Sequence, residues 1–398
     1  MYDAIVIGTR AAGAPTAMLL ARKGYRVLAV DRATFPSDTL STHIIHAPGV
    51  AALHRWGLLD RLTATGCPPI TQYSFDFGPV VISGTTLPVD GIDTAYAPRR
   101  TVLDKLLVDA AREAGVEVRE ACNVDEVLIE DGRVTGIRSG DREARAHIVI
   151  GADGRNSKVA KAVGAQDYNT KPRLQYAYFT YFSGLPVSGF ETYIRPDRGF
   201  GAAPTNDGLT MVVLGWPHAE AQAFKADVAG NFYRTLDLVP SFAARLGAAK
   251  QEAPFLGGSV PGWFRTPYGD GYALVGDAGY NKDPITAQGI TDAFHDAERC
   301  SNAVDDWLGG GKPFEDVMGT WHQERDAQAT PLYEFTAQLA TLEPAPAAMQ
   351  QLLGAIQGNQ DAMDGFVSVI SGALSPTDFF AEGNVRRILA EASASPTR

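Results

Sequence analysis

The chain opens with the residues MYDAIVIGTRAAGAPTAMLLARKGYRVLAVDR, and the loop GTRAAG, Gly8–Gly13, decides the fold. Before it, residues 3–7, DAIVI, contain after Asp3 a short, continuous apolar run that is typical of a buried parallel strand. After it, residues 14–24 carry apolar side chains at helical spacing and end in glycine, and residues 25–32 predict a second strand. The stretch therefore predicts a strand–loop–helix–strand unit of the kind that binds a dinucleotide.

The loop has one unusual residue, because Arg10 occupies the position of the middle glycine. In such a loop Gly8 makes the tight turn, Gly13 lets the helix pack close to the strand, and backbone N–H groups near Ala12 hold phosphates. Three alternatives stay open for Arg10: it reaches the diphosphate or another nearby group, it extends into solvent, or the loop is degenerate and empty. Asp31 follows at about the 20-residue offset where an acidic side chain meets a ribose hydroxyl.

Composition bounds the class of protein. The 398 residues fit two lobes, and a formal net charge of -11 argues against a nucleic-acid partner. The three cysteines, Cys67, Cys122 and Cys300, have neither metal nor disulfide spacing, so we expect no metal site. The apolar runs are too short for a membrane span and no signal peptide precedes the first strand, so we expect a cytoplasmic protein.

Three later segments support a nucleotide site. Residues 97–120, APRRTVLDKLLVDAAREAGVEVRE, place an arginine pair before an amphipathic helix and a strand. Residues 144–164, ARAHIVIGADGRNSKVAKAVG, run from an apolar strand into an Asp-Gly turn and a short helix. Residues 269–300, GDGYALVGDAGYNKDPITAQGITDAFHDAERC, predict a strand ending in aspartate and then a helix whose N-terminal amides favour negative charge.

The ordered set GTRAAG, VDR, RRTVLDKLL, GADGRNS and GDAGYNKDPITAQG resembles the flavoprotein monooxygenase superfamily typified by para-hydroxybenzoate hydroxylase, over roughly the first 300 residues. The resemblance implies FAD as cofactor. It implies as FAD-binding residues Gly8, Arg10, Ala12, Gly13, Asp31, Arg32, Arg100, Val124, Asp153, Gly276, Asp277, Pro284, Gly289 and Ile290.

The same resemblance gives these residues places along the cofactor. Arg100 would lie beside the flavin's linker, Val124 near the adenine, and Asp153 in the Asp-Gly motif that supports FAD. Asp277 would meet the ribityl and diphosphate region, and residues 284–290 would lie against the isoalloxazine.

The chain also departs from the superfamily pattern. Ala287 replaces the first glycine of the usual Gly-Gln-Gly, and Gly279 and Tyr280 stand where Ala-His is frequent. Residues 35–62, FPSDTLSTHIIHAPGVAALHRWGLLDRL, look closer to the geranylgeranyl-reductase and halogenase branch.

We predict an α/β fold with a Rossmann-like FAD-binding domain, an antiparallel β-sheet substrate domain and C-terminal helices. The FAD-binding domain would be discontinuous, residues 1–170 and 255–310, with residues 70–100 contributing to the substrate side. Residues 171–254 would form the substrate domain and residues 311–398 the helical region, ending in a disordered tail, ASASPTR. The predicted substrate-binding residues are His46, Tyr176, Tyr178, Phe182 and Tyr193.

His43 is the candidate catalytic residue, because the resemblance brings its segment toward the flavin. It is a candidate base for a phenol or an indole N–H. The remaining histidines are expected to be structural or exposed: His54, His147, His218, His295 and His322.

The function expected from the resemblance is hydroxylation of an aromatic or polycyclic small molecule through a flavin hydroperoxide, with NADH or NADPH as transient electron donor and molecular oxygen as co-substrate. A single dinucleotide loop fits either a one-component hydroxylase or one that is served by a partner flavin reductase, and a homodimer is possible. Three alternatives remain. They are an ene-reductase of the geranylgeranyl-reductase type, a halogenase (the W-x-W-x-I-P signature is absent) and a non-catalytic escort-type binding protein.

Overall fold

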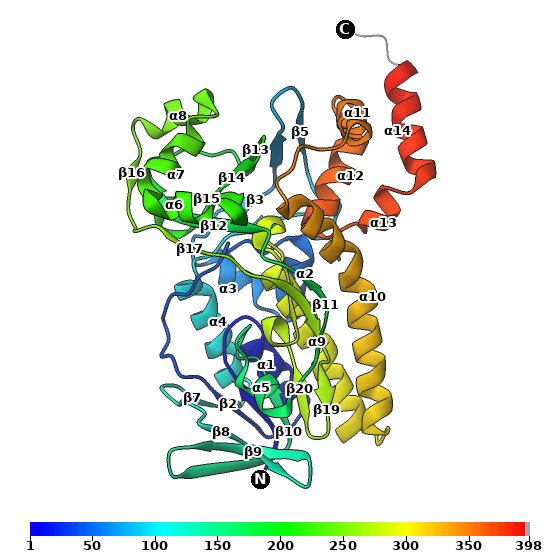
Figure 1. Cartoon of the computed structure of the whole chain (residues 1–398). Coiled ribbons are helices and arrows are strands. Elements are labelled where there is room, and N and C mark those ends of the chain that lie inside the picture. The colour runs from blue at the N-terminus through cyan, green and yellow to red at the C-terminus, as the bar shows by residue number, and fades with distance from the viewer. Residues whose placement is uncertain (395–398) are drawn as a thin grey trace.

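A computed structural model describes residues 1–394 of the chain. It has a mainly parallel sheet at one end and a mainly antiparallel sheet at the other, and the long helix α10 (Phe314–Ala340) runs along one side of the molecule (Figure 1). The predicted α/β class with a second sheet and C-terminal helices is confirmed.

The first sheet has the strand order β19-β20-β10-β1-β2-β7, and its five strands from β20 to β7 are parallel. Its strands are β1 (Tyr2–Ile7), β2 (Val27–Val30), β7 (Glu117–Arg119), β10 (Arg142–Gly151), β19 (Tyr268–Gly269) and β20 (Tyr272–Leu274). β8 (Glu126–Glu130) and β9 (Arg133–Ser139) continue β10 as an antiparallel meander. The helices around this sheet are α1 (Gly13–Arg22), α2 (Ala47–Arg55), α3 (Leu59–Thr63), α4 (Arg100–Glu113), α5 (Lys158–Val163) and α9 (Gly289–Leu308).

Both faces of this sheet are covered, which explains the unbroken apolar run at the start of the chain. Ala4 and Val6 pack on the side of α1, α4 and α9, whereas Ile5 and Ile7 pack on the side of the meander and α5. A strand buried on both faces needs apolar residues at every position rather than at alternate ones.

The second sheet has the order β16-β12-β15-β14-β13-β4-β5, with β17 also paired to β12. Its strands are β4 (Tyr73–Asp76), β5 (Val81–Gly84), β12 (Gln175–Ser183), β13 (Phe190–Arg195), β14 (Arg198–Pro204), β15 (Leu209–Pro217), β16 (Lys250–Gln251) and β17 (Leu256–Gly258). One face is covered by α6 (Ala221–Ala226), α7 (Val228–Leu236) and α8 (Pro240–Leu246), three helices that the sequence reading did not anticipate. The domain boundaries at residues 170, 254 and 310 stay predictions.

Two small sheets and four 3₁₀ turns connect these parts. They are β3 (Pro69–Ile70) with β6 (Ala95–Tyr96), β11 (Asp167–Lys171) with β18 (Gly262–Arg265) and β21 (Tyr280–Asn281), and η1 (Asn206–Gly208), η2 (His218–Glu220), η3 (Gly276–Ala278) and η4 (Pro284–Thr286).

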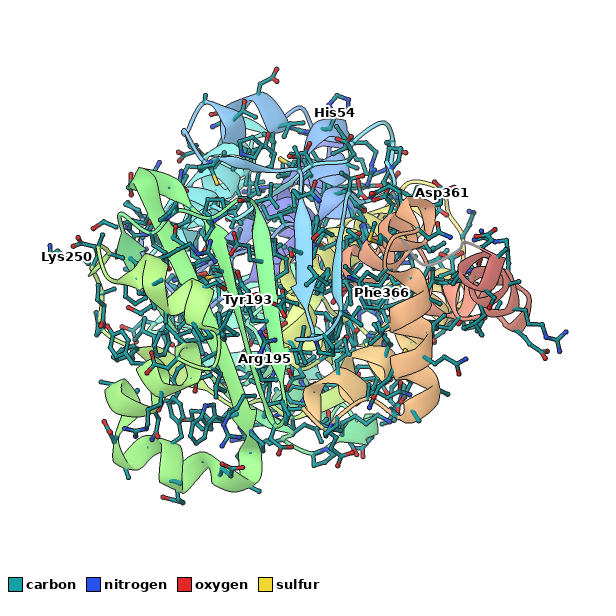
Figure 2. The ribbon with its side chains drawn as sticks, turned by 90° about the horizontal axis from the view of Figure 1, so that it is seen from above. His54, Tyr193, Arg195, Lys250, Asp361 and Phe366 are labelled. Atoms are coloured by element: carbon teal, nitrogen blue, oxygen red, sulfur yellow. The ribbon has the colours of Figure 1, made fainter. Side chains whose placement is uncertain are left out.

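The helices after α10 complete the second lobe. They are α11 (Ala347–Ile356), α12 (Gln360–Ser371), α13 (Pro376–Phe379) and α14 (Glu382–Ala394). Figure 2 shows α12, which carries Phe366, beside the strands of the second sheet, and the Phe366 ring lies 5.6 Å from that of Phe75 on β4. Of the tail predicted to be disordered, residues 392–394 belong to α14 and residues 395–398 lie outside the described part.

None of the helices in residues 1–394 is long and apolar enough to cross a lipid bilayer. No three His, Cys, Asp or Glu side chains in this range are grouped so that they could hold a metal ion.

Candidate active site

Four of the predicted cofactor segments meet at one edge of the parallel sheet. The loop Gly8–Gly13 follows β1, Asp31 follows β2, Asp153 follows β10, and the turn 276–278 follows β20. Because these strands are parallel, their carboxyl ends lie side by side, and that edge is where open α/β sheets bind ligands.

Close backbone contacts explain the glycines of the loop. A Cβ atom on Gly13 would lie 1.8 Å from the carbonyl oxygen of Gly8, and one on Gly8 would lie 2.4 Å from that of Ala152. Gly8 also has a φ of +92°. A Cβ on Gly276 would come within 2.7 Å of the Cβ of Ala12, the N-cap residue of α1. The helix start therefore packs directly on two strand ends, as a phosphate-binding turn requires.

Arg10 is bound within the protein rather than extended into solvent. Its Nη1 donates to Asp104 Oδ2 at 2.5 Å and to the carbonyl of Ser37 at 3.2 Å, and its guanidinium lies 5.2 Å from the centre of the Phe35 ring. The other oxygen of Asp104 accepts two hydrogen bonds, at 2.8 and 3.0 Å, from Arg100. Asp104 is fully buried and is the common counter-ion of both arginines.

Asp31, which follows β2 at this edge, is fixed by hydrogen bonds from neighbouring residues. Its Oδ2 accepts hydrogen bonds from the amide and hydroxyl of Thr9, and its Oδ1 accepts one from the amide of Ala33 at 2.8 Å. A carboxylate offers about four acceptor sites, so one remains for a ligand hydroxyl. Arg32 is exposed next to it, and Val124 is buried in the core under the meander.

The two other acidic candidates have different environments. Asp153 accepts a hydrogen bond from the amide of Lys158 at 2.6 Å, and its Oδ1 is buried with no hydrogen-bond partner among the described residues. Asp277 is exposed to solvent although its neighbours Gly276 and Ala278 are buried. It lies deep among protein atoms, which raise its pKa to about 6 by displacing bulk water, while Arg100 opposes that effect. An exposed carboxylate at such a depth indicates a solvent-accessible space inside the molecule.

The segment before α9 adjoins this space. Ala287 adopts a left-handed conformation with a φ of +53°, the region that glycine favours, and this is the position where the superfamily pattern has glycine. Gly289 is exposed and begins α9, whereas Ile290 behind it is buried and Pro284 is partly buried. The N-terminal amides of a 20-residue helix thus open toward the same region.

These features fit a dinucleotide cofactor such as FAD. The cradle at Gly8 and Gly13 would be filled by any Cβ, and the unpartnered Oδ1 of Asp153 lies at the same edge. The edge also carries an exposed helix start and an exposed carboxylate, Asp277, for polar groups of a bound molecule.

His43 lies in a buried cluster that joins the two lobes. Its Nε2 is hydrogen-bonded to the hydroxyl of Tyr181 on β12, and the two rings are stacked with centres 5.7 Å apart. The ring is fully buried, its Nδ1 has no partner within residues 1–394, and its φ of +63° is strained for a non-glycine residue. Burial lowers the pKa of His43 to about 3, helped by Arg100 and Arg99, so the imidazole is neutral at neutral pH.

Arg99 also belongs to this cluster and contacts Tyr181. Its guanidinium lies 5.2 Å from the centre of the Tyr181 ring, and its Nε is buried with no partner in the described chain. Burial raises the pKa of Tyr181 to about 12, an effect that Arg99 opposes, so the hydroxyl keeps its proton and donates it to His43 Nε2. The proton of the imidazole is then on Nδ1, the nitrogen without an acceptor.

His46 has a different role. Its Nδ1 accepts from the hydroxyl of Tyr73 at 3.0 Å and its Nε2 donates to the carbonyl of Thr286 at 3.0 Å. Both nitrogens are satisfied in full burial, and burial lowers the pKa of His46 to about 4. His46 therefore links α2 to the η4 turn and has no hydrogen-bonding capacity left for a substrate.

The four predicted aromatic substrate residues lie on the opposite face of the second sheet from His43. Tyr178 stacks on Phe224 of α6, and Tyr193 packs on Phe242 of α8. Tyr176 and Phe182 share that helix-covered side with them. Alternate residues of a strand point to opposite faces, so Phe179 and Tyr181 are the ones beside His43. This location differs from the one expected, because the aromatic composition of β12 does not specify which face is covered.

Sequence reasoning also missed Asp104 and Asp283. Asp283 caps η4 by accepting from the amide of Ile285 at 3.0 Å, and it accepts a further hydrogen bond from the side chain of Gln175 on β12. Burial raises its pKa to about 7. For Asp104 a usable signal existed, because an acid four residues after Arg100 on a helix can pair with it. Nothing in the sequence indicated that Asp283 would be buried.

Comparison with known proteins agrees with this geometry. The profile of the FAD binding domain family matches residues 1–253. The rifampicin monooxygenase of Streptomyces venezuelae is 24% identical over 385 residues, which cover 89% of this chain and 75% of that one. Digeranylgeranylglycerophospholipid reductase 2 of Methanopyrus kandleri is 28% identical over 307 residues, 73% of each chain.

Among solved structures, a flavoprotein/dehydrogenase from Cytophaga hutchinsonii superposes with a TM-score of 0.83 over 98% of both chains, at 19% identity, which shows the same fold. The family profile covers well over half of the chain, and the glycine cradle, the exposed helix start and the aspartates at the strand ends fit its cofactor. The chain belongs to the FAD binding domain family within the FAD-dependent monooxygenase superfamily and is an FAD-dependent oxidoreductase.

Proposed function

We propose that this protein is a monooxygenase that hydroxylates an aromatic or polycyclic small molecule, with electrons from NADH or NADPH. The observation that carries the proposal is the His43–Tyr181 pair, held in a strained backbone conformation between the two lobes with one imidazole nitrogen unpartnered. Strained, buried and incompletely bonded polar residues concentrate at functional sites. The similarity to a rifampicin monooxygenase supports the reaction class.

FAD would lie along the carboxyl edge of the parallel sheet. The amides near Gly13 and the Arg10–Asp104–Arg100 cluster would meet its diphosphate region, Asp31 its ribose, and the start of α9 its isoalloxazine. The positive end of the α9 dipole favours negative charge at that position. Bound and reduced, FAD supplies the activation of molecular oxygen for this chemistry.

We assign the substrate to the face of the second sheet that carries Tyr181. Small residues, Gly201 among them, lie in the middle of this face. A Cβ atom added to Gly201 would lie 3.3 Å from the Phe190 ring. The hydroxyl of Thr192 is buried without a partner in the described chain, so it can bind a polar group. Protein on both sides excludes water from a reacting molecule here.

His43 would orient a substrate oxygen, such as a phenol or carbonyl oxygen, by donating its Nδ1–H to it. A neutral imidazole has one donor and one acceptor nitrogen, and Tyr181 occupies Nε2. Nδ1 therefore offers its N–H to an acceptor oxygen of the substrate while the ring stays fixed by Tyr181. Arg99 would stabilise negative charge that develops on a bound phenol.

An oxygen-uptake assay on the FAD-loaded enzyme tests the reaction class. With NADPH or NADH and an accepted aromatic compound, we expect one oxygen consumed per hydroxylated product, and label from ¹⁸O₂ in the product. Tyr181→Phe should lower kcat about tenfold or more, whereas Tyr176→Phe, on the same strand but the helix-covered face, should not. Product formation without oxygen consumption would refute monooxygenation.

Reduction of an isoprenoid double bond is the second candidate, supported by the similarity to the Methanopyrus reductase. It predicts an anaerobic reaction in which the product gains two hydrogens and no oxygen. A halogenated product, formed when halide is added to the aerobic assay, would indicate halogenation instead. If neither NADH nor NADPH reduces the flavin, a partner reductase must supply the electrons.

A further inference from the structure

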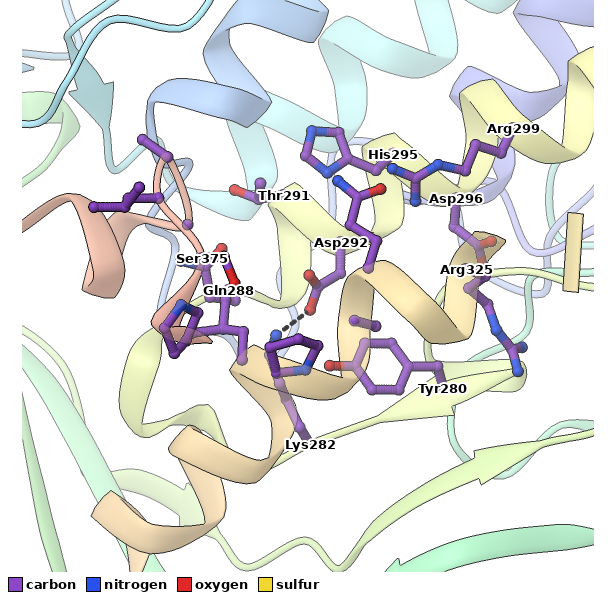
Figure 3. A pocket seen from close by; sticks show the side chains of 18 residues that line it. Tyr280, Lys282, Gln288, Thr291, Asp292, His295, Asp296, Arg299, Arg325 and Ser375 are labelled. Atoms are coloured by element: carbon purple, nitrogen blue, oxygen red, sulfur yellow. Dashed lines mark ion pairs between the residues drawn. The ribbon is translucent and has the colours of Figure 1, made fainter. Parts of the chain in front are cut away.

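A second cavity lies behind α9, between α9, α10 and residues 372–376 (Figure 3). Its volume is about 280 Å³, enough for a small organic molecule. None of the residues assigned above to FAD or to substrate lines it. Ile290, Ala293 and Phe294 of α9 pack into the core of the first lobe, whereas Asp292, His295 and Arg299 line the cavity.

Two buried polar side chains enter this cavity with unused hydrogen-bonding capacity. Tyr280 is 7% exposed and its hydroxyl has no partner among residues 1–394. Lys282 is 9% exposed, and its Nζ lies 2.8 Å from Asp292 Oδ2, the ion pair drawn in Figure 3. One ion pair leaves two of the three ammonium protons without an acceptor. Buried polar groups are rarely left unsatisfied, so a further partner is expected at this point.

The groups that remain free are mainly donors. Arg299 lines the cavity with a half-buried, positively charged side chain. Burial lowers the pKa of the neighbouring His295, so that residue adds no fixed charge. Asp296, in contrast, is already used, because it accepts from the amide of Gly276 at 2.8 Å and from the indole of Trp321 at 3.2 Å. The cavity therefore favours a ligand that brings acceptor oxygens and negative charge.

A second wall, formed by α10 and residues 372–376, is partly apolar. Leu332, Ala329, Leu374 and Pro376 line it beside the polar side chains of Gln328 and Ser375. An inorganic anion would leave this wall uncovered, whereas an acid with a hydrocarbon body would contact it. The two walls together describe a small amphipathic acid.

We propose that this cavity is a binding site for a small organic carboxylate, whose acid group lies at Lys282 and Tyr280 and whose apolar part lies against α10. Lys282 Nζ is 5.4 Å from the centre of the Tyr280 ring, so a single carboxylate can reach both groups. The site is separate from the reaction centre and does not depend on which oxidation or reduction the enzyme performs.

Calorimetric titration of the FAD-loaded enzyme with phenylacetate and with hexanoate, in the absence of nicotinamide and substrate, tests the proposal. We expect binding of at least one of these acids at one site per chain, at least tenfold tighter than its neutral amide. Tyr280→Phe keeps the ring and removes the hydroxyl, and it should weaken binding about fivefold. Ala329→Leu should abolish binding by filling the apolar wall.

Two controls make the outcome decisive. Tyr181→Phe, next to His43, should leave acid binding unchanged, and all variants should keep the unfolding midpoint and flavin content of the parent. Failure of both acids to bind, equal binding of acid and amide, or loss of binding in Tyr181→Phe but not in Tyr280→Phe would each overturn the proposal. Chloride or phosphate binding as tightly as the organic acids would also overturn it. Oxygen uptake is measured separately, so failure here leaves the proposed function standing.

Discussion

The guanidinium of Arg10, in the dinucleotide loop, lies 2.5 Å from the carboxylate of Asp104, in the first turns of α4. This contact links the loop that was unusual in sequence to the helix that carries Arg100. An arginine in place of the middle glycine is therefore accommodated because a buried acid receives its side chain.

Asp104→Asn should destabilise the protein by about 3 kcal/mol, because two arginines lose their shared buried counter-ion. We also expect weaker FAD binding, since both arginines then lose their fixed positions. Urea unfolding and flavin titration measure the two effects. Asp109→Asn is the matched control on the same helix, because Asp109 pairs with Lys105 near the surface, where ion pairs contribute at most about 1 kcal/mol. Equal losses in both variants would contradict the assigned role of Asp104.

Gly13→Ala should abolish flavin retention. The added Cβ would lie 1.8 Å from the carbonyl oxygen of Gly8, which forces α1 away from β1 and opens the phosphate turn. The flavin-to-protein absorbance ratio after gel filtration measures the loss. Gly383→Ala, in α14 with no atom within 4 Å of the new Cβ, should keep the flavin and be unchanged or slightly more stable. Full flavin content in Gly13→Ala would contradict the loop assignment.

The sequence predicted the fold well where one physical constraint dominated a segment. The continuous apolar runs and the glycines of β1 and α1 predicted a parallel sheet buried on both faces, with its ligand edge at the strand ends. The strands between residues 175 and 217 were also predictable, from their length, their β-branched and aromatic content and their turns.

The site was less predictable because it depends on which face of a strand is covered. Tyr178 and Tyr181 on β12 have the same composition signal, yet α6 covers the first and His43 contacts the second. A shift of one residue exchanges the two faces, and only the position of α6–α8 settles it. The environment of His46 was not predictable either, because its two hydrogen-bond partners come from residues 27 and 240 positions away in the sequence.

Asp283 should make the stability of the protein depend on pH. Its pKa of about 7 in the folded protein lies above the 3.8 of the free group. Below about pH 4 the Asp283 carboxyl is protonated in both the folded and the unfolded protein, so its ionisation does not reduce the free energy of unfolding. As pH rises toward 7 the unfolded chain ionises while the folded one keeps its proton, so stability falls, and it levels off above 7.

Asp283→Asn should remove that fall while keeping the hydrogen bond from Gln175. Between pH 4 and 7 the free energy of unfolding of the variant should therefore rise, relative to that of the parent, by up to about 4 kcal/mol. Urea midpoints at several pH values measure it. A difference that does not change with pH would show that the carboxyl is not buried as the structure has it.

Substitutions on the two faces of the second sheet should separate stability from catalysis. The hydroxyl of Tyr193 donates to Glu191 at 2.7 Å and accepts from Arg245 at 2.7 Å on the helix-covered face. Tyr193→Phe should cost about 1 kcal/mol of stability and leave KM and kcat unchanged. Val213→Phe, on the face of Phe179 and Tyr181, should raise KM several-fold or change the accepted substrates, because it narrows the space we assign to the substrate. Steady-state kinetics beside urea unfolding distinguishes the two effects. A kinetic change in Tyr193→Phe with none in Val213→Phe would place the substrate on the other face of the sheet.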